Sequence, residues 1–206
     1  MPIVKINITP IPQTGEICKP TALAAIEKYY ALKMNFNAIP LNKRNNPLHR
    51  HKKHTISMRE LAKLHGSVQG ELLEIQQVTD ILKEIGYTSS AIDFKNKFEF
   101  FKATIIENIT AGNLIFAAFS VDRDQGSSRY GHPTTDPRDA IDRNEHAAVI
   151  HGYDTENEII YITHWGKEWA CSFLDFYNSS MVLLETREAE HYKNVKSNPS
   201  DKRYKY

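Results

Sequence analysis

One cysteine and one histidine, far apart in the sequence, have neighbours that suit them for nucleophilic chemistry. Cys18 follows a short loop that carries Gln13, and it opens the apolar run Lys-Pro-Thr-Ala-Leu-Ala-Ala-Ile. His146 begins the run His-Ala-Ala-Val-Ile-His-Gly-Tyr. A free thiol titrates at about 8.5 and a free imidazole at about 6.5, so a hydrogen bond between them can yield a thiolate–imidazolium pair. These residue types therefore predict attack of a thiolate on a carbonyl carbon.

The cysteine is expected at the start of a helix that runs from about residue 18 to residue 32. Pro20 fits its first turn, because the N–H that proline lacks would have no intrahelical partner there. Leu23 and Tyr30 share one face of this helix, as an amphipathic helix requires. The helix macrodipole favours negative charge at the N-terminus, which is a physical reason to place a reactive sulfur at Cys18.

Acyl transfer also needs donors for the developing oxyanion and a group that carries protons. The amide of Gln13 and the backbone N–H of Cys18 are suitable oxyanion donors. His146 enters a strand of small apolar residues and can present its ring as a general base and then as a general acid. The ordinary alternatives are a loop glutamine, a buried helix cysteine and a strand histidine, because short motifs also arise by chance.

The rest of the sequence predicts helices first and an antiparallel sheet afterwards, which is an α+β fold. Period-two alternation and helical periodicity, bounded by Gly and Pro, define the expected elements. Besides the first helix, we expect helices at 57–65, 72–85 and 97–109, a helical turn at 173–177, and strands at 3–8, 87–93, 114–119, 146–152, 158–163 and 181–185.

Composition and charge describe an ordinary globular protein. The chain has 206 residues, of which 41% are hydrophobic and 25% charged, and its formal net charge is +1. This charge gives no reason to expect nucleic acid or a membrane as partner. No apolar run approaches the roughly 20 residues that span a bilayer, and the N-terminus lacks the pattern of a secretory signal.

The chain has only two cysteines, Cys18 and Cys171. A catalytic Cys18 must stay reduced, so we expect no disulfide and a reducing compartment. The expected location is the cytoplasm, or secretion without a signal peptide as for an injected effector. Cys171 is expected to be a small buried hydrophobic side chain.

We expect a single domain over residues 1–187 and a polar, flexible tail over residues 188–206. The loop at 35–56 contains a basic cluster, Lys43–His54, which we interpret as solvated surface, since charge runs usually are. A phosphate-rich partner or an acidic substrate is the alternative for this cluster. Three histidines there lack the neighbours and spacing of a zinc site: His49, His51 and His54.

The loop at 121–145, just before the histidine, is too long for a simple connector and is interpreted as a rim of the cleft. Its start, Asp122-Arg-Asp-Gln-Gly, resembles a calcium turn but lacks the distal glutamate of an EF-hand. We therefore expect neither a metal nor a cofactor. Whether Arg143 or Glu145 reaches the site stays open at this point.

The order of these motifs resembles that of the papain-like cysteine peptidases. Their common pattern is a glutamine, a cysteine at a helix start, a histidine followed by small residues and Gly-Tyr, and a strand that ends in Trp-Gly-x-x-Trp. Here the last motif is Trp165-Gly-Lys-Glu-Trp169. The Cys-Lys-Pro-Thr-Ala-Leu stretch looks closest to the bacterial C39-like branch. The resemblance covers residues 13–30 and 145–185, and the middle of the chain only in its order of elements.

This resemblance implies a papain-like fold and a cysteine peptidase in which Cys18 is the nucleophile, His146 the base and Gln13 an oxyanion donor. The partner would be a protein or peptide substrate, attacked through an acyl-enzyme. Related thiol scaffolds also support glutamine deamidation and transamidation, which bacterial effectors perform on host proteins. A catalytically inactive binding module is a further alternative.

The resemblance leaves the third catalytic member open, because that position is usually Asn or Asp. Alignment on Trp165-Gly166 places Thr163 there, and alignment on the preceding strand places His164 there. Strand alternation lets only one of the two face His146. Neither is a carboxylate, so neither supports an imidazolium as a negative charge would. Tryptophans such as Trp165 and Trp169 are most often packing residues, and the alternative here is that they also shield the His146 hydrogen bond from water.

Overall fold

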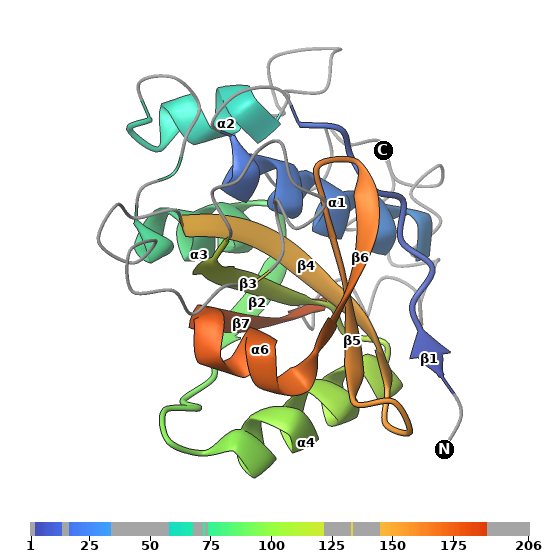
Figure 1. Ribbon diagram of the computed structural model, residues 1–206. Coiled ribbons are helices and arrows are strands. Elements are labelled where there is room, and N and C mark those ends of the chain that lie inside the picture. The colour runs from blue at the N-terminus through green and yellow to red at the C-terminus, as the bar shows by residue number, and fades with distance from the viewer. Residues whose placement is uncertain are drawn as a thin grey trace.

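The computed structural model describes residues 3–13, 17–33, 58–67, 72, 74–121, 133 and 145–188. Within these residues, five helices lie on the two faces of a seven-stranded sheet, so the expected α+β fold is confirmed (Figure 1). The elements in chain order are β1 (Val4–Lys5), α1 (Cys18–Lys33), α2 (Met58–Leu64), α3 (Ile75–Glu84), β2 (Tyr87–Ala91), α4 (Phe98–Thr110), β3 (Ile115–Ser120), β4 (Glu145–Asp154), β5 (Ile159–His164), β6 (Lys167–Ser172), α6 (Phe173–Ser179) and β7 (Ser180–Glu188).

The strand order is β2-β7-β3-β4-β5-β6, with β1 added to β4, and each of these pairings is antiparallel. In Figure 1, α1, α2 and α3 lie on one side of the sheet, and α4 and α6 lie on the other. None of the helices in the described part of the chain is long and apolar enough to span a bilayer.

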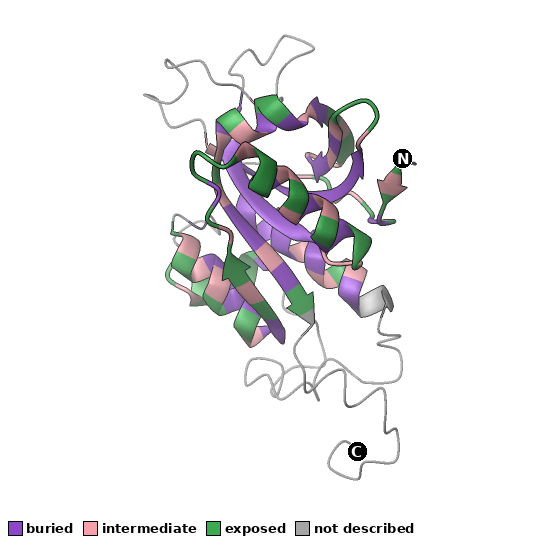
Figure 2. Ribbon diagram, turned by 90° about the horizontal axis from the view of Figure 1, so that it is seen from below, coloured by how far each residue is buried: buried purple, intermediate pink, exposed green. Residues whose placement is uncertain are grey.

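The core lies along the central strands, as Figure 2 shows by the buried residues of the sheet. Strand β3 begins with the continuous apolar run Ile-Phe-Ala-Ala-Phe, because helices cover both of its faces, and it ends at Ser120. Helix α3 buries Val78, Ile81 and Leu82, which share one face at helical spacing. The outer faces of the helices carry the exposed residues.

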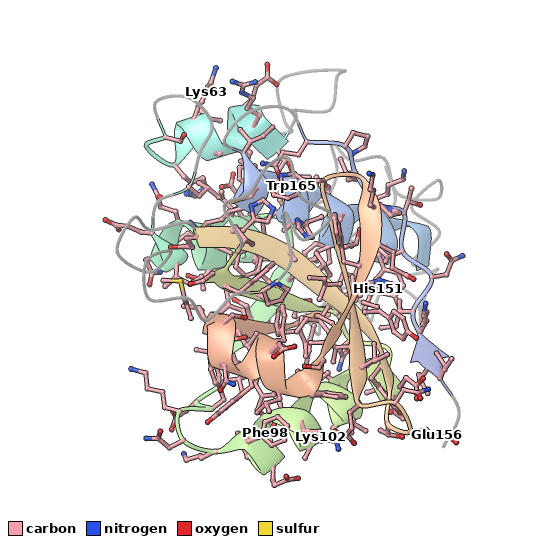
Figure 3. All side chains as sticks on the ribbon, in the orientation of Figure 1. Lys63, Phe98, Lys102, His151, Glu156 and Trp165 are labelled. Atoms are coloured by element: carbon pink, nitrogen blue, oxygen red, sulfur yellow. The ribbon has the colours of Figure 1, made fainter. Side chains whose placement is uncertain are left out.

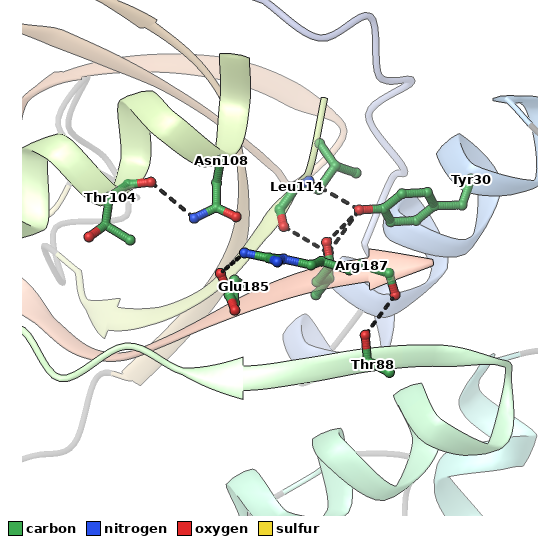
Figure 4. A network of polar contacts seen from close by, with 8 residues as sticks. Tyr30, Thr88, Thr104, Asn108, Leu114, Glu185 and Arg187 are labelled. Carbon is green, nitrogen blue, oxygen red and sulfur yellow. Dashed lines mark hydrogen bonds and ion pairs between the residues drawn. The ribbon is translucent and has the colours of Figure 1, made fainter. Parts of the chain in front are cut away.

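A buried hydroxyl anchors α1 to the sheet (Figure 4). Tyr30 donates to the carbonyl of Thr186 in β7 at 2.6 Å and accepts from the N–H of Leu114 at 3.3 Å. Thr186 in turn donates its hydroxyl to the carbonyl of Leu114 at 2.7 Å. Buried polar groups are stable when bonded in this way. Since a helix is rigid over this length, the anchor at Tyr30 also determines where Cys18 meets the sheet.

Two elements differ from the expectations by more than the position of their ends: one strand was not expected, and one is much shorter than expected. Strand β6 (Lys167–Ser172) was not expected, because it is an edge strand with several exposed residues and lacks clear alternation. The strand expected at 3–8 is one only over Val4–Lys5. Beyond it, the backbone N–H of Ile6 still donates to the carbonyl of His151 at 2.7 Å, so the segment stays against the sheet.

Some expectations concern parts of the chain outside the described residues. The basic loop at 35–56 falls there, as do the tail from residue 189 and nearly all of the loop at 121–145.

Candidate active site

The N-terminus of α1 packs against the first residues of β4. The backbone N–H of Ala147 forms a hydrogen bond with the Cys18 sulfur. Lys19 Nζ lies 2.6 Å from Glu145 Oε1. These two contacts place Cys18 beside the residues that flank His146 in the sequence. The helix with the candidate nucleophile and the strand with the candidate base therefore meet.

The His146 side chain, however, points to the opposite face of the sheet. Successive side chains of a strand alternate between its faces, and Glu145 and Ala147 face α1. The His146 ring lies against Phe119, its partner across the β3–β4 pair, with ring centroids 6.1 Å apart. Among the described residues, His146 Nε2 has no hydrogen-bond partner. A hydrogen bond from this nitrogen to the Cys18 thiol is thus not formed in the structure.

Strand β5 carries both candidates for the third position, on opposite faces of the sheet. The ring of His164 lies against that of His146, with centroids 4.6 Å apart. Thr163 pairs with Val149 and donates its hydroxyl to the carbonyl of Lys167 at 3.1 Å. Of the two candidates, His164 is the one that faces His146.

A two-residue turn, Trp165–Gly166, joins β5 to β6 and places an indole against both histidines. Figure 3 shows Trp165 at the end of the sheet that α1 covers. Its ring centroid lies 4.4 Å from that of His146 and 4.8 Å from that of His164. Trp165 and Gly166 have φ of 47° and 71°, the signs that a type I′ turn requires. Positive φ is strained for a bulky residue, so the ring contacts must hold Trp165 in place.

A small cavity joins Cys18 to three of the other candidates. Gln13, Thr163 and His164 line it together with Cys18 and Ala147. Its volume of about 10 Å³ is close to the least that one water molecule needs. Gln13 thus lies near the sulfur, as an oxyanion donor must, while a peptide chain would have to bind outside this cavity.

The segment at 3–13, which carries Gln13, is held against the sheet at two glycines. A Cβ on Gly152 would lie 2.8 Å from a side-chain carbon of this segment, which is closer than real contacts allow. A Cβ on Gly166 would lie 3.1 Å from the Cα of Pro12, the residue before Gln13. Close backbone approach of this kind favours glycine. The turn that carries the indole therefore also packs against the backbone next to Gln13.

Burial keeps both members of the candidate dyad neutral. It raises the pKa of the Cys18 thiol, although the charge of Lys19 and the N–H of Ala147 act to lower that pKa and Glu145 acts to raise it. Burial, with a smaller effect of Lys19, lowers the pKa of His146 to about 3. At pH 7 the resting site therefore holds a thiol and a neutral imidazole, and the ion pair that these residue types can form is absent.

Lys19 lies at the candidate site, although the sequence analysis did not single it out. Its signal is a charged side chain in the first turn of a helix, directly after the candidate nucleophile. The sequence analysis left open whether Glu145 reaches the candidate site. Its ion pair with Lys19, the residue after Cys18, places its carboxylate there. Pairing of this kind depends on tertiary contact, so sequence spacing alone does not reveal it.

The second cysteine lies away from this site. Cys171 is buried in β6, burial raises the pKa of its thiol, and its sulfur donates to the carbonyl of Ile160 at 3.9 Å. Both cysteines are free. Among the described residues, no group of three or more His, Cys, Asp or Glu side chains could hold a metal ion. The basic cluster at 43–54 and the aspartates that begin at Asp122 lie outside the described residues.

Of the comparisons with known proteins, the family model identifies the family. Residues 5–181 match the model described as "Peptidase_C39 like family". A solved structure of a candidate C39-like peptidase from Bacillus anthracis is 13% identical with a TM-score of 0.54, and the match covers 92% of this chain and all of that one. At this identity the likeness concerns the fold, and it agrees with the expected papain-like α+β architecture. No match is found among the curated proteins.

Proposed function

The chain belongs to the C39-like peptidase family, and from this premise we propose that Cys18 cleaves peptide bonds through an acyl-enzyme. Family membership supports peptidase activity of the cysteine type, while the assignment of residues and steps is our inference. One observation carries it, namely that the first turn of α1 docks on the start of β4 through the Ala147 N–H and the Cys18 sulfur. This contact supports the assignment, because it brings the thiol to the residue that follows His146 in the sequence.

In the proposed mechanism, His146 moves the protons. Its Nε2 takes the thiol proton as the sulfur attacks the carbonyl carbon, and it gives that proton to the leaving amine when the C–N bond breaks. Water then attacks the thioester while His146 takes a proton from it, and the released sulfur regains its proton. The C–S bond formed in the first half is broken in the second.

This mechanism requires the His146 ring to approach the sulfur when substrate binds. The ring must leave its position beside Phe119, from which it does not reach Cys18. Since Nε2 has no hydrogen-bond partner among the described residues, the movement breaks no hydrogen bond at that atom. Catalytic hydrogen bonds are often loose before substrate binds and tighten only in the complex.

The proposed roles of the oxyanion donors and of the third catalytic residue are inferred from where these residues lie relative to Cys18 and His146. Gln13 and the backbone N–H of Cys18 would donate to the oxyanion, and the cavity that Gln13 shares with the sulfur supports this role. We assign the third position to His164 rather than Thr163, because the His164 ring lies against that of His146. In its neutral form, an imidazole can accept one hydrogen bond and so orient its neighbour.

The test is mass spectrometry of protein substrates incubated with the wild-type chain and the Cys18→Ala variant. We expect cut backbones with the wild type and none with Cys18→Ala, while a Cys171→Ala control stays active. Full activity in Cys18→Ala would refute the assignment. A gain of about one dalton or a cross-link would indicate deamidation or transamidation. Unchanged substrate with a thiol that labels like free cysteine would indicate a binding module.

The place of action stays a prediction. A cysteine nucleophile works only when reduced, which favours the cytoplasm or delivery, as for a bacterial effector, into the cytoplasm of a host. A protein or peptide is the proposed substrate in either place.

A further inference from the structure

Beside the candidate dyad lies a partly buried ion pair that the proposed mechanism does not use. The Lys19 side chain is only 7% exposed, and its Nζ lies 2.6 Å from Glu145 Oε1. The Glu145 side chain is 29% exposed. A buried ammonium is costly unless it is paired, so Glu145 is what keeps Lys19 inside. Each member of the pair is also adjacent in sequence to one member of the dyad.

The surroundings of the sulfur contain few charges. Helix α1 contributes the Lys19 ammonium to the surroundings of the Cys18 sulfur. Strand β4 contributes the Glu145 carboxylate and the N–H of Ala147. From β5, His164 lines the same cavity. Among the described groups that act on the sulfur, Lys19 is therefore the cation.

We propose that Lys19, held by Glu145, is the cation that stabilises the Cys18 thiolate, a role that a dyad mechanism would give to protonated His146. The proposal rests on the proposed function, in which Cys18 is the nucleophile. Lys19 touches no reacting atom in this scheme and acts as a positioning residue through its charge.

The effect of Lys19 on both members of the dyad supports this. The ammonium lowers the pKa of the Cys18 thiol, and Glu145 opposes it. The same ammonium also lowers the pKa of His146. Lys19 thus favours negative sulfur and disfavours an imidazolium. His146 still carries the proton during acylation, and its low pKa makes it ready to pass that proton to the leaving amine.

The test is the pH dependence of Cys18 alkylation by iodoacetamide, since this reagent reacts with the thiolate. Cys171→Ala serves as background in the full chain. Lys19→Met should raise the midpoint by about 1 pH unit and slow alkylation at pH 7 about tenfold. Glu145→Gln should lower the midpoint, because the neutral amide oxygen can still accept from Lys19 while the opposing negative charge is removed. Lys19→Arg should restore the wild-type profile.

Opposite shifts from the two single variants separate a charge effect from a structural one, because unfolding would expose the thiol in both. If Lys19→Met fails to fold, the neutral pair Lys19→Met/Glu145→Gln keeps the site uncharged and should have a midpoint above that of Glu145→Gln, because it lacks the ammonium. Equal or absent shifts in the single variants would overturn the proposal. So would His146→Ala, if it shifted the midpoint as far as Lys19→Met.

Alkylation needs no peptide substrate, so the two proposals can fail separately. An inactive wild-type chain with the expected shifts would reject the peptidase mechanism but keep the role of Lys19. Peptide cleavage without those shifts would keep the peptidase mechanism and reject the role of Lys19.

Discussion

The ring of Trp165 lies 4.4 Å from the ring of His146, centroid to centroid, although the tryptophan has a backbone φ of 47°. The strained turn thus brings an indole against His146. Burial of this histidine lowers its pKa and keeps it neutral. Strain at a residue with positive φ persists only where surrounding contacts hold it. The contact therefore links the geometry of the β5–β6 turn to the protonation of the candidate base.

Removing the indole should raise the pKa of His146. In Trp165→Ala, water reaches the imidazole, and the desolvation that lowers its pKa to about 3 is relieved. We expect the pKa to move toward 6.5, as followed by NMR titration and assigned with His146→Gln. Trp169→Ala is the matched control, because Trp169 lies against His164, at 5.4 Å between centroids. Equal shifts in both variants would show that burial by Trp165 is not the cause.

A side chain at Gly166 should reduce both stability and activity. Gly166→Ala combines positive φ with a Cβ 3.1 Å from Pro12, so it should displace the backbone next to Gln13. Gly66→Ala is the control, because Gly66 has φ of 89° but its new Cβ would meet nothing closer than 3.8 Å. The control should cost about 1 kcal/mol of unfolding free energy, and Gly166→Ala more. Urea unfolding and kcat check this, and an unaffected kcat in Gly166→Ala would argue against a role of the contact in placing Gln13.

Stability should fall as the solution is acidified, in part because of His146. Its pKa is about 3 when folded and about 6.5 when unfolded, so between these values the unfolded chain binds the extra proton. The contribution is fully present above pH 6.5 and is lost progressively down to pH 3. At pH 5 the loss is about 2 kcal/mol relative to pH 7. Urea unfolding of His146→Gln should show a shallower decline, whereas parallel curves would exclude this histidine as a source.

Loss of the Tyr30 hydroxyl should destabilise the packing of α1 on the sheet. Tyr30→Phe removes the donor to Thr186 and leaves the Leu114 N–H without that acceptor. The expected cost is about 1–3 kcal/mol of unfolding free energy, because these groups are buried. Tyr29→Phe is the control, since the Tyr29 hydroxyl donates to the carbonyl of Gly112 at 3.1 Å from a half-buried position. An equal loss of unfolding free energy in both variants would mean that the buried hydrogen bonds of Tyr30 stabilise the protein no more than the half-buried one of Tyr29.

The fold could be anticipated because its signals are local. Helix α1 was expected within one residue of its observed ends, since Pro20 marks its first turn and apolar residues recur along one face. The central strand β3 stands out as an apolar run between polar segments. Edge strand β6 could not be anticipated, because it depends on the turn at Trp165–Gly166 and on pairing with β5.

The site could be anticipated only in part. Sequence alone indicated candidate residues, and three of them, Gln13, Cys18 and His164, line one cavity in the structure. It could not indicate which way His146 points, because a change of one residue in strand register moves every side chain to the other face. That direction follows from the pairing of His146 with Phe119, which is a long-range contact.

The burial of the sulfur has a consequence for chemical damage. Cys18 is only 9% exposed, and burial keeps its proton attached at pH 7. Peroxides oxidise the thiolate form of accessible cysteines. Burial therefore shields this thiol from sulfenic acid formation in the structure, and any movement that exposes and deprotonates the sulfur would remove that protection.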